Sequence, residues 1–318
     1  MRRFAIIFAP LLLASVALVG CGSSSGGAAP AAAVTVTGTF GKAPAVKIPA
    51  VKAGSKLDVQ TLIHGTGPTL ASTDAFVGNY VVYIWSGTTN KLAQSTFKTV
   101  PALFSGKLLP GLEDAVKGQK IGSRVLAVIP PADGYGKAGN SQGGVKPTDT
   151  LVFVVDMIKA FAADASAAGK SVSSGGNGLP TVTASAAGAA PTITIPHSGK
   201  APSTLAAKTL IQGTGPAITK GQYVVAQYVG VVWRTDKVFD SSWSDGAPFG
   251  FVIGASPTQV IPGWNTGLLG KAVGSRIMLS IPPKDGYGST GNSQAGIKGT
   301  DTLVFVIDIL GAYSPQAS

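Results

Sequence analysis

The chain has 318 residues, enough for about two domains of ordinary size, and 45% of them are hydrophobic, which is enough to give each domain a core. Its 43 glycines and 21 prolines indicate many turns and short strands rather than long helices. The net charge is +11, but the lysines stand singly and only Arg124, Arg234 and Arg276 lie beyond the first three residues. This scatter argues against a nucleic-acid-binding protein.

The N-terminus predicts an export signal and a lipid anchor. Two arginines follow the initial methionine, and residues 4–19 form an apolar run that is shorter than the roughly 20 residues of a membrane span. The run closes on Leu-Val-Gly-Cys, which resembles a bacterial lipobox, and its Cys21 is the only cysteine of the chain. Residues 22–27 are glycine and serine, as is typical of a flexible tether. We therefore expect a signal peptide at residues 1–20, a lipidated Cys21 and a tether over residues 21–39; an ordinary secretory signal is the alternative.

One window in the first half has the composition of a short helix. The stretch LPGLEDAVKG, residues 109–118, has Pro110 near its start and Glu113 in its opening turn. Leu112 and Val116 are four residues apart, and a lysine and a glycine end the stretch. This order of residues is the one that favours a helix start, an apolar face and a helix stop.

Several phrases occur twice along the chain. TLIHGTG at residues 61–67 returns as TLIQGTG, and DGYGKAGNSQGGVKPTDTLVFVVDMI at residues 133–158 returns nearly unchanged at residues 285–310. Two copies of one domain follow. The stretch between them is rich in Ala, Ser and Gly without sustained apolar periodicity, which is typical of a linker. We expect domain 1 at residues 40–163, a linker at residues 164–186 and domain 2 at residues 187–318.

Each copy also contains short runs that alternate with the period of a β-strand. In the second copy, the apolar residues at positions 303, 305, 307 and 309 would share one face of a strand, and those at positions 277, 279 and 281 would share a face of another. Strands of this kind around one helix-sized window predict an α+β fold. Each domain is expected to be an antiparallel sheet packed on one short helix.

Three kinds of chemistry are excluded by context. GYGSTG at residues 286–291 fits a dinucleotide-binding fingerprint, with Asp308 downstream, but two prolines precede it and no helical pattern follows. His64 and His197 are the only histidines, and neither has a cysteine or a second histidine nearby. A zinc site or a catalytic triad cannot be assembled from one such residue per domain. We expect no cofactor and no metal.

Six blocks of the second copy carry a resemblance to a known family. In chain order they read AQYVG, VFDSSW, PFGF, VIPGW, DGYG and TLVFVIDIL, within residues 210–313. Their order and approximate spacing resemble an FKBP-type peptidyl-prolyl cis-trans isomerase. The resemblance implies an antiparallel sheet wrapped on a short helix, with a proline pocket between them.

The resemblance also implies a set of site residues in domain 2. Trp264 would be the floor of the pocket, Tyr287 would donate to a substrate carbonyl, and Asp240 would place a carboxylate beside the carbonyl that rotates. Ile261 would offer its backbone N–H to the same peptide. The full set comprises catalytic residues Tyr228, Phe239, Asp240, Phe251, Trp264, Tyr287 and Phe305, and substrate-binding residues Phe249, Val260, Ile261 and Ile297. Taken singly, Phe251, Trp264 and Phe305 would be interpreted as ordinary core residues; only their occurrence together with FDSS and DGYG favours a pocket.

The first copy keeps only part of this set. Aligning the two copies places Trp85 opposite Tyr228, Gln94 opposite Asp240 and Leu112 opposite Trp264, while Phe104, Tyr135 and Phe153 match Phe251, Tyr287 and Phe305. Replacing the indole floor and removing the carboxylate should impair the reaction. We expect domain 1 to fold in the same way but to isomerise poorly or not at all, and to hold extended peptide, to space domain 2 from the membrane, or both.

Three functions are compatible with the whole sequence. The first is a lipid-anchored, extracytoplasmic bacterial prolyl isomerase that assists the folding of exported proteins. Its expected partners are unfolded or proline-containing polypeptides, and we expect it to act as a monomer. The second is a binding chaperone in which turnover is incidental. The third is a structural surface lipoprotein that retains the scaffold without a working pocket, because a fold alone never proves an activity.

Overall fold

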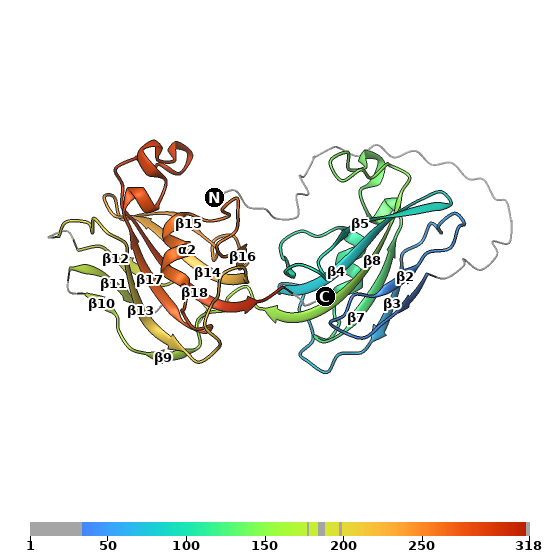
Figure 1. Ribbon diagram of the computed structural model, residues 1–318, viewed down its shortest axis with the longest axis horizontal. Helices are drawn as coiled ribbons and strands as arrows, with labels where there is room; N and C mark the ends of the chain where they lie inside the picture. The colour runs from blue at the N-terminus through green and yellow to red at the C-terminus, as the bar shows by residue number, and fades with distance from the viewer. Residues whose placement is uncertain (1–33, 177, 184–187, 197–198, 316–318) are drawn as a thin grey trace.

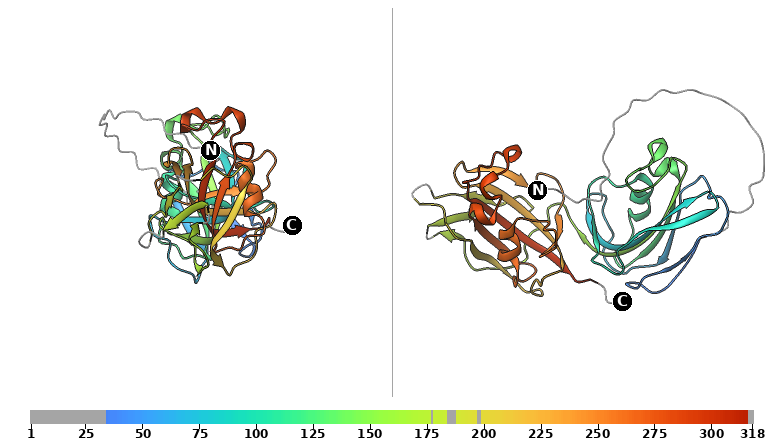
Figure 2. Two further views of the ribbon diagram at one scale, coloured as in Figure 1. Left: turned by 90° about the vertical axis from the view of Figure 1, so that its left-hand side faces the viewer. Right: turned by 45° about the horizontal axis from the view of Figure 1, so that its top comes forward.

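The computed structural model describes residues 34–176, 178–183, 188–196 and 199–315. It shows two sheet domains joined near the middle of the molecule (Figure 1). The expected signal peptide and Cys21 lie outside the described residues, and so does His197, whereas His64 is exposed. Figure 2 shows the same two bodies from the side and from above.

Domain 1 contains one antiparallel sheet. Its strands lie in the order β3-β7-β8-β4-β5, and β6 pairs with the beginning of β4. The elements are β3 (Asp58–Ile63), β4 (Ala75–Ser86), β5 (Thr89–Ser95), β6 (Ala102–Phe104), α1 (Pro110–Val116), β7 (Arg124–Ile129), η1 (Pro131–Asp133), η2 (Gly136–Ala138) and β8 (Thr150–Phe161).

Domain 2 repeats this arrangement. The order is β15-β14-β18-β17-β13-β9, and β16 pairs with β14. The elements are β9 (Gly169–Ser171), β13 (Ala206–Gly213), β14 (Tyr223–Val232), β15 (Lys237–Ser241), β16 (Phe249–Val252), α2 (Pro262–Leu268), β17 (Arg276–Ile281), η3 (Pro283–Asp285), η4 (Gly288–Thr290), η5 (Ser293–Ala295) and β18 (Leu303–Tyr313). The expected α+β fold of two tandem domains is confirmed.

The helix expected from the sequence is confirmed in both copies. Proline occupies the first turn of α1 and of α2, where its missing N–H costs no hydrogen bond. Glu113 lies in the first turn of α1, and the N–H of Lys117 donates to the carbonyl of Glu113 at the other end. The buried side of α1 carries Leu112 and Val116, so the helix covers one face of its sheet with the residues four apart in the sequence.

The central strands of each sheet, β4 and β8 in domain 1 and β14 and β18 in domain 2, are buried on both faces. Along β18, Phe305 and Ile307 belong to the cluster under α2, whereas Val304 and Val306 belong to a second cluster on the rear face. A small hairpin covers that rear face in each domain: β1 (Thr35–Thr37) pairs with β2 (Ala45–Lys47), and β11 (Leu179–Thr183) pairs with β12 (Thr192–Thr194). The strands therefore contain nearly continuous apolar runs, as strands buried on both sides do.

The stretch expected to be a linker has a structural role in domain 2. Within residues 164–186, β9 extends the main sheet beside β13, and β10 (Gly175–Gly176) pairs with β11 of the rear hairpin. Likewise β1 lies within residues 21–39, where a tether was expected. The composition of both stretches gave no sign of these strands, because each is only two to five residues long.

A buried ion pair crosses the rear face of each sheet at equivalent positions. Arg124 Nε lies 2.6 Å from Asp156 Oδ1, and Arg276 Nε lies 2.6 Å from Asp308 Oδ1. The second carboxylate oxygen accepts a backbone N–H from the covering segment, from Gly41 in domain 1 and from Ala167 in domain 2. Each pair thus ties its rear layer to the sheet.

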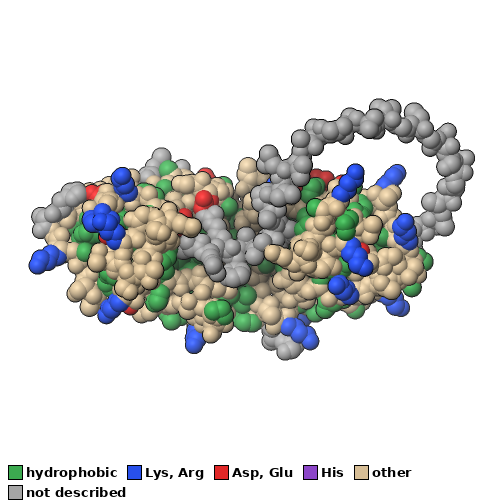
Figure 3. Space-filling model, turned by 90° about the horizontal axis from the view of Figure 1, so that it is seen from above, with side chains coloured by type: hydrophobic (Ala, Val, Ile, Leu, Met, Phe, Trp, Pro, Cys, Tyr) green, Lys and Arg blue, Asp and Glu red, His purple; other side chains and the backbone are tan. Residues whose placement is uncertain are grey.

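The positive charge is spread over the surface. Seen from above, lysine and arginine side chains stand apart from one another over both domains (Figure 3). On that face they form no continuous basic stripe.

Arg124→Met should destabilise domain 1 by about 3–5 kcal/mol, because it leaves the Asp156 carboxylate buried without its partner. The measurement is the denaturant midpoint of the domain 1 transition. Arg234→Met, measured on the domain 2 transition, is the control, since the Arg234 side chain is 44% exposed and its partner Asp301 also accepts the N–H of Lys298, so a half-exposed pair of this kind should contribute little. Equal shifts for the two variants would contradict the assignment.

Candidate active site

Trp264 lies at the centre of an aromatic cluster between α2 and the sheet of domain 2. Its ring makes edge-to-face contacts with the rings of Tyr228 at 5.2 Å, Phe305 at 5.3 Å and Phe251 at 5.4 Å between centroids. Phe249 approaches to 6.4 Å. These rings come from β14, β18 and β16, so the indole joins the helix to three strands. Trp264 faces Phe305, as the pocket interpretation of the sequence requires.

The structure brings the whole expected set together. Every aromatic and aliphatic member belongs to one cluster or packs against it, and Asp240 joins through Tyr228, whose hydroxyl donates to Asp240 Oδ2 at 2.7 Å. We call this set the cup; it comprises Tyr228, Phe239, Asp240, Phe249, Phe251, Val260, Ile261, Trp264, Tyr287, Ile297 and Phe305.

One wall of the cup depends on a glycine. Phe239 packs edge-to-face on Phe305 at 5.5 Å, lying across Gly230 of β14. A Cβ at Gly230 would lie 2.7 Å from the Phe305 ring and 2.8 Å from the Phe239 ring, closer than side chains pack. Phe239 can therefore cover this part of the strand only because residue 230 has no side chain.

The cup is closed over its floor. Trp264, Tyr228, Phe251 and Phe305 have no exposed surface, whereas Phe239, Asp240, Phe249 and Tyr287 are partly exposed at the rim. Ile261 is the N-cap residue of α2, so its N–H is outside the ladder of the helix. The indole Nε1 is buried without a hydrogen-bond partner in the described part of the chain. The indole is therefore shielded from solvent by the side chains around it.

A residue that sequence reasoning missed orients Tyr287. The Tyr287 hydroxyl is hydrogen-bonded to the side chain of Asn292, and Asn292 Oδ1 accepts from the N–H of Ala295. The contact with Asn292 acts to lower the pKa of Tyr287, as donation from the Asn292 amide to the tyrosine oxygen does, and such donation leaves the tyrosine's own proton available to a carbonyl in the cup. The shared GNSQ of the two copies was the available signal, since Tyr135 has the same partner in Asn140.

The interior of domain 1 is built from different side chains. Tyr80 pairs with Val155 of β8 as Tyr228 pairs with Ile307 of β18, so Tyr80, and not Trp85, is the counterpart of Tyr228. The expected role of Trp85 is corrected accordingly.

Trp85 belongs to the rear cluster, and its Nε1 donates to the carbonyl of Val51 at 2.9 Å. Tyr80 and Tyr228 stand equally far after the repeated TLIHGTG and TLIQGTG, so the expected pairing of Trp85 with Tyr228 introduced a gap that the structure does not contain. The other counterparts have the expected register: Gln94 opposes Val82 as Asp240 opposes Gly230, and Phe104 lies on β6 as Phe251 lies on β16.

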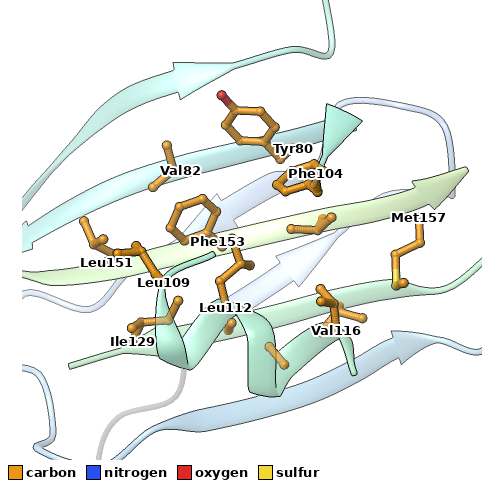
Figure 4. Packing of buried hydrophobic residues seen from close by; sticks show 14 of the residues in the cluster. Tyr80, Val82, Phe104, Leu109, Leu112, Val116, Ile129, Leu151, Phe153 and Met157 are labelled. Atoms are coloured by element: carbon orange, nitrogen blue, oxygen red, sulfur yellow. The ribbon is translucent and has the colours of Figure 1, made fainter. Parts of the chain in front are cut away.

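Domain 1 lacks the features that define the cup in domain 2. Leu112 replaces the indole and packs with Leu109 and Phe153 under the sheet (Figure 4). Gln94 is exposed, so Tyr80 has no carboxylate acceptor there, and burial raises the pKa of Tyr80 to about 12. Phe153 is 7% exposed where Phe305 is fully buried, because alanine stands at position 93 in place of Phe239.

Features outside the cup were compared with those that a metal site or a membrane span requires. No group of three or more His, Cys, Asp or Glu is arranged to hold a metal ion in that part of the chain. A separate hollow of about 260 Å³ lies on the rear of domain 2 beside Ser173 and Arg276, remote from the cup. Within the described residues, no helix has the length and apolarity that a membrane crossing needs.

Comparison with known proteins identifies two matching segments. The family model described as "FKBP-type peptidyl-prolyl cis-trans isomerase" matches residues 69–158 and 215–310. An FK506-binding protein of Streptomyces anulatus is 42% identical over 109 residues, which are 34% of this chain and 86% of that protein. A probable FK506-binding protein of Corynebacterium glutamicum is 38% identical over 111 residues, 35% of this chain and 89% of that protein.

A solved structure of the three FKBP domains of wheat FKBP73 is 22% identical and covers 80% of this chain and 94% of its own, with a TM-score of 0.32.

Any loss of prolyl-peptide binding to domain 2 through ionisation of Tyr287 should begin at a higher pH than the ionisation of a free tyrosine. Burial raises the pKa of the Tyr287 hydroxyl above its ordinary value, so the folded protein keeps this proton at a pH where a free tyrosine near pKa 10 begins to lose it. Titration calorimetry at several pH values tests this. Affinity that falls from about pH 9 in the unaltered protein, but not in Tyr287→Phe, would show that the hydroxyl ionises early.

Proposed function

Because the chain belongs to the FKBP-type peptidyl-prolyl cis-trans isomerase family, we propose that it catalyses this isomerisation mainly in domain 2. The supporting observation is the enclosure of Trp264 by Tyr228, Phe251 and Phe305, which only domain 2 possesses among the described residues. Domain 1 has Leu112 at the position of the indole.

The proposed mechanism uses a dry apolar site. An X-Pro bond faces a rotation barrier of roughly 18–20 kcal/mol and interconverts over tens to hundreds of seconds. Twisting the amide removes its resonance and thereby its charge separation, so an apolar surround destabilises the planar ground state more than the twisted state. Removing about 7 kcal/mol from the barrier would give a rate gain on the order of 10⁵.

Two polar groups at the rim would orient the peptide. Tyr287, held by Asn292, would donate to a substrate carbonyl. The Asp240 carboxylate, already accepting from Tyr228 at 2.7 Å, would lie beside the carbonyl that rotates. Because the indole is covered, binding would begin with displacement of rim side chains such as Phe249.

We further propose that the enzyme acts outside the cytoplasm on exported polypeptides, as a monomer anchored through a lipid on Cys21. The support is the apolar N-terminal run that closes on the only cysteine of the chain.

A peptide-binding chaperone is the second candidate. The closed floor of the cup favours it, since a ligand held at the rim by Phe239 and Phe249 would bind without twisting an amide. A change of Trp264 separates the two functions, because it should impair isomerisation but not the binding of peptide at the rim.

Trp264→Leu, which copies the residue of domain 1, should lower kcat/KM by about 10- to 100-fold. The measurement is the acceleration of a proline-limited refolding phase by the chain starting at Gly22.

Tyr287→Phe should also slow the reaction, whereas the matched change Tyr135→Phe in domain 1 should not. Unchanged acceleration in Trp264→Leu contradicts catalysis in domain 2, and persisting suppression of aggregation in that variant supports an additional chaperone activity.

Cys21→Ser should move the protein from the membrane fraction to the soluble fraction of the cell envelope, because the acyl acceptor is lost. Fractionation and immunoblotting measure this. Ser23→Ala, two residues away, is the control and should stay with the membrane. A Cys21→Ser protein that remains in the membrane fraction would contradict the lipid anchor.

A further inference from the structure

The two domains meet at an apolar joint. Val77 of β4 and Phe161 of β8 contribute from domain 1, and Val225 of β14 contributes from domain 2. Tyr223 and Tyr313, which face each other on β14 and β18, pack against them. Val77 and Val225 are fully buried, so the joint excludes water at its centre.

A hydrogen bond crosses the joint between an edge strand of domain 1 and a core strand of domain 2. The backbone N–H of Leu103 in β6 donates to the hydroxyl oxygen of Tyr223 at 3.2 Å. Leu103 precedes Phe104, which lies in the core of domain 1. The edge strands β6 and β16 contact each other across the joint.

Tyr223 also supports the strand that carries two walls of the cup. A Cβ at Gly250 would overlap the Tyr223 hydroxyl, and the three atoms nearest to that position all belong to the Tyr223 side chain. Gly250 stands between Phe249 and Phe251 in β16. The Tyr223 ring therefore lies directly against the backbone that sets the positions of these two phenylalanines.

We propose that Tyr223 is a positioning residue for the cup of domain 2 and that domain 1 holds it in place through Leu103. The inference rests on the proposed function of domain 2. It gives domain 1 a part in catalysis that needs no pocket of its own: domain 1 fixes the edge strand from which Phe249 and Phe251 project.

Tyr223→Phe in the full chain tests the hydrogen bond while keeping the ring. We expect displacement of Phe249 and Phe251 to weaken contact with the ring of the substrate in the planar and in the twisted state alike, so KM should rise by about fivefold with kcat within about twofold of the unaltered enzyme. General destabilisation would instead lower kcat by reducing the active fraction. Tyr313→Phe is the matched control, because Tyr313 lies in the same cluster and its hydroxyl makes no hydrogen bond within the described residues. It should leave both constants unchanged.

A spectroscopic readout makes the test independent of activity. In protein labelled with 5-fluorotryptophan, the ¹⁹F resonance of Trp264, assigned with Trp264→Phe, should shift in Tyr223→Phe, since Phe251 contacts the indole at 5.4 Å. The resonance of Trp85, on the rear face of domain 1, should not move.

A double-mutant cycle tests the contact with β16. Gly250→Ala alone should raise KM, because its methyl group meets the Tyr223 side chain. In a Tyr223→Ala background the same change should have no further effect. If Gly250→Ala raises KM equally in both backgrounds, the contact between residue 250 and the Tyr223 side chain is not the cause.

The two proposals fail in different ways. Activity that is absent in the unaltered chain, or retained in Trp264→Leu, overturns the proposed function, while the fluorine shift still decides whether Tyr223 positions the cup. The positioning role alone is overturned if Trp264→Leu abolishes the activity while Tyr223→Phe leaves both KM and the Trp264 resonance unchanged. A fall in kcat with constant KM also overturns it.

Discussion

The packing of Trp264 against three rings is the interaction on which the rest of domain 2 depends. Each edge-to-face pair adds about 0.5–1.5 kcal/mol beyond the burial of its surface, and the three pairs join α2 to β14, β16 and β18. The same ring is the floor of the proposed site. Stability and binding therefore make opposite demands on it: the core is most stable when the indole is covered, whereas a ligand must uncover it.

Domain 1 shows how the fold is kept when that ring is absent. Phe76 occupies the register of Val224 and stacks on Phe104 at 4.6 Å, and Val82 occupies the register of Gly230. Larger residues on β4 thus compensate for smaller ones at positions 93, 102 and 112. Cores tolerate such exchanges when the total volume is kept, so the sheet and helix persist although the cup does not.

The sequence was sufficient to predict the helices and the inward faces of two strands of domain 2, and the family resemblance named the residues that gather in the cup. These features depend on local periodicity and on short blocks of residues, which a single chain displays directly. The rear layer was not predictable in this way, because β1 and β11 derive their stability from the sheet beneath them rather than from their own composition. The exchange of Trp85 for Tyr80 had a different cause: the two tyrosines have the same spacing from the repeated TLIHGTG and TLIQGTG, so an alignment without a gap was available, and the pairing of Tyr80 with Val155 confirms it. Asn292 was missed because its role depends on a contact across a loop.

The joint has one more property. Val77 and Val225, which meet at its centre, hold equivalent places in the two copies, as their pairing with Leu103 and Gly250 shows. Association through the same patch on both partners is the geometry of a two-fold homodimer. In such a dimer every substitution is made twice, once on each side. Fusion into one polypeptide removes that restriction and raises the effective concentration of one half around the other. Tyr223 can therefore face a domain that has alanine at the equivalent position, residue 75. The two halves can differ in chemistry while they stay assembled.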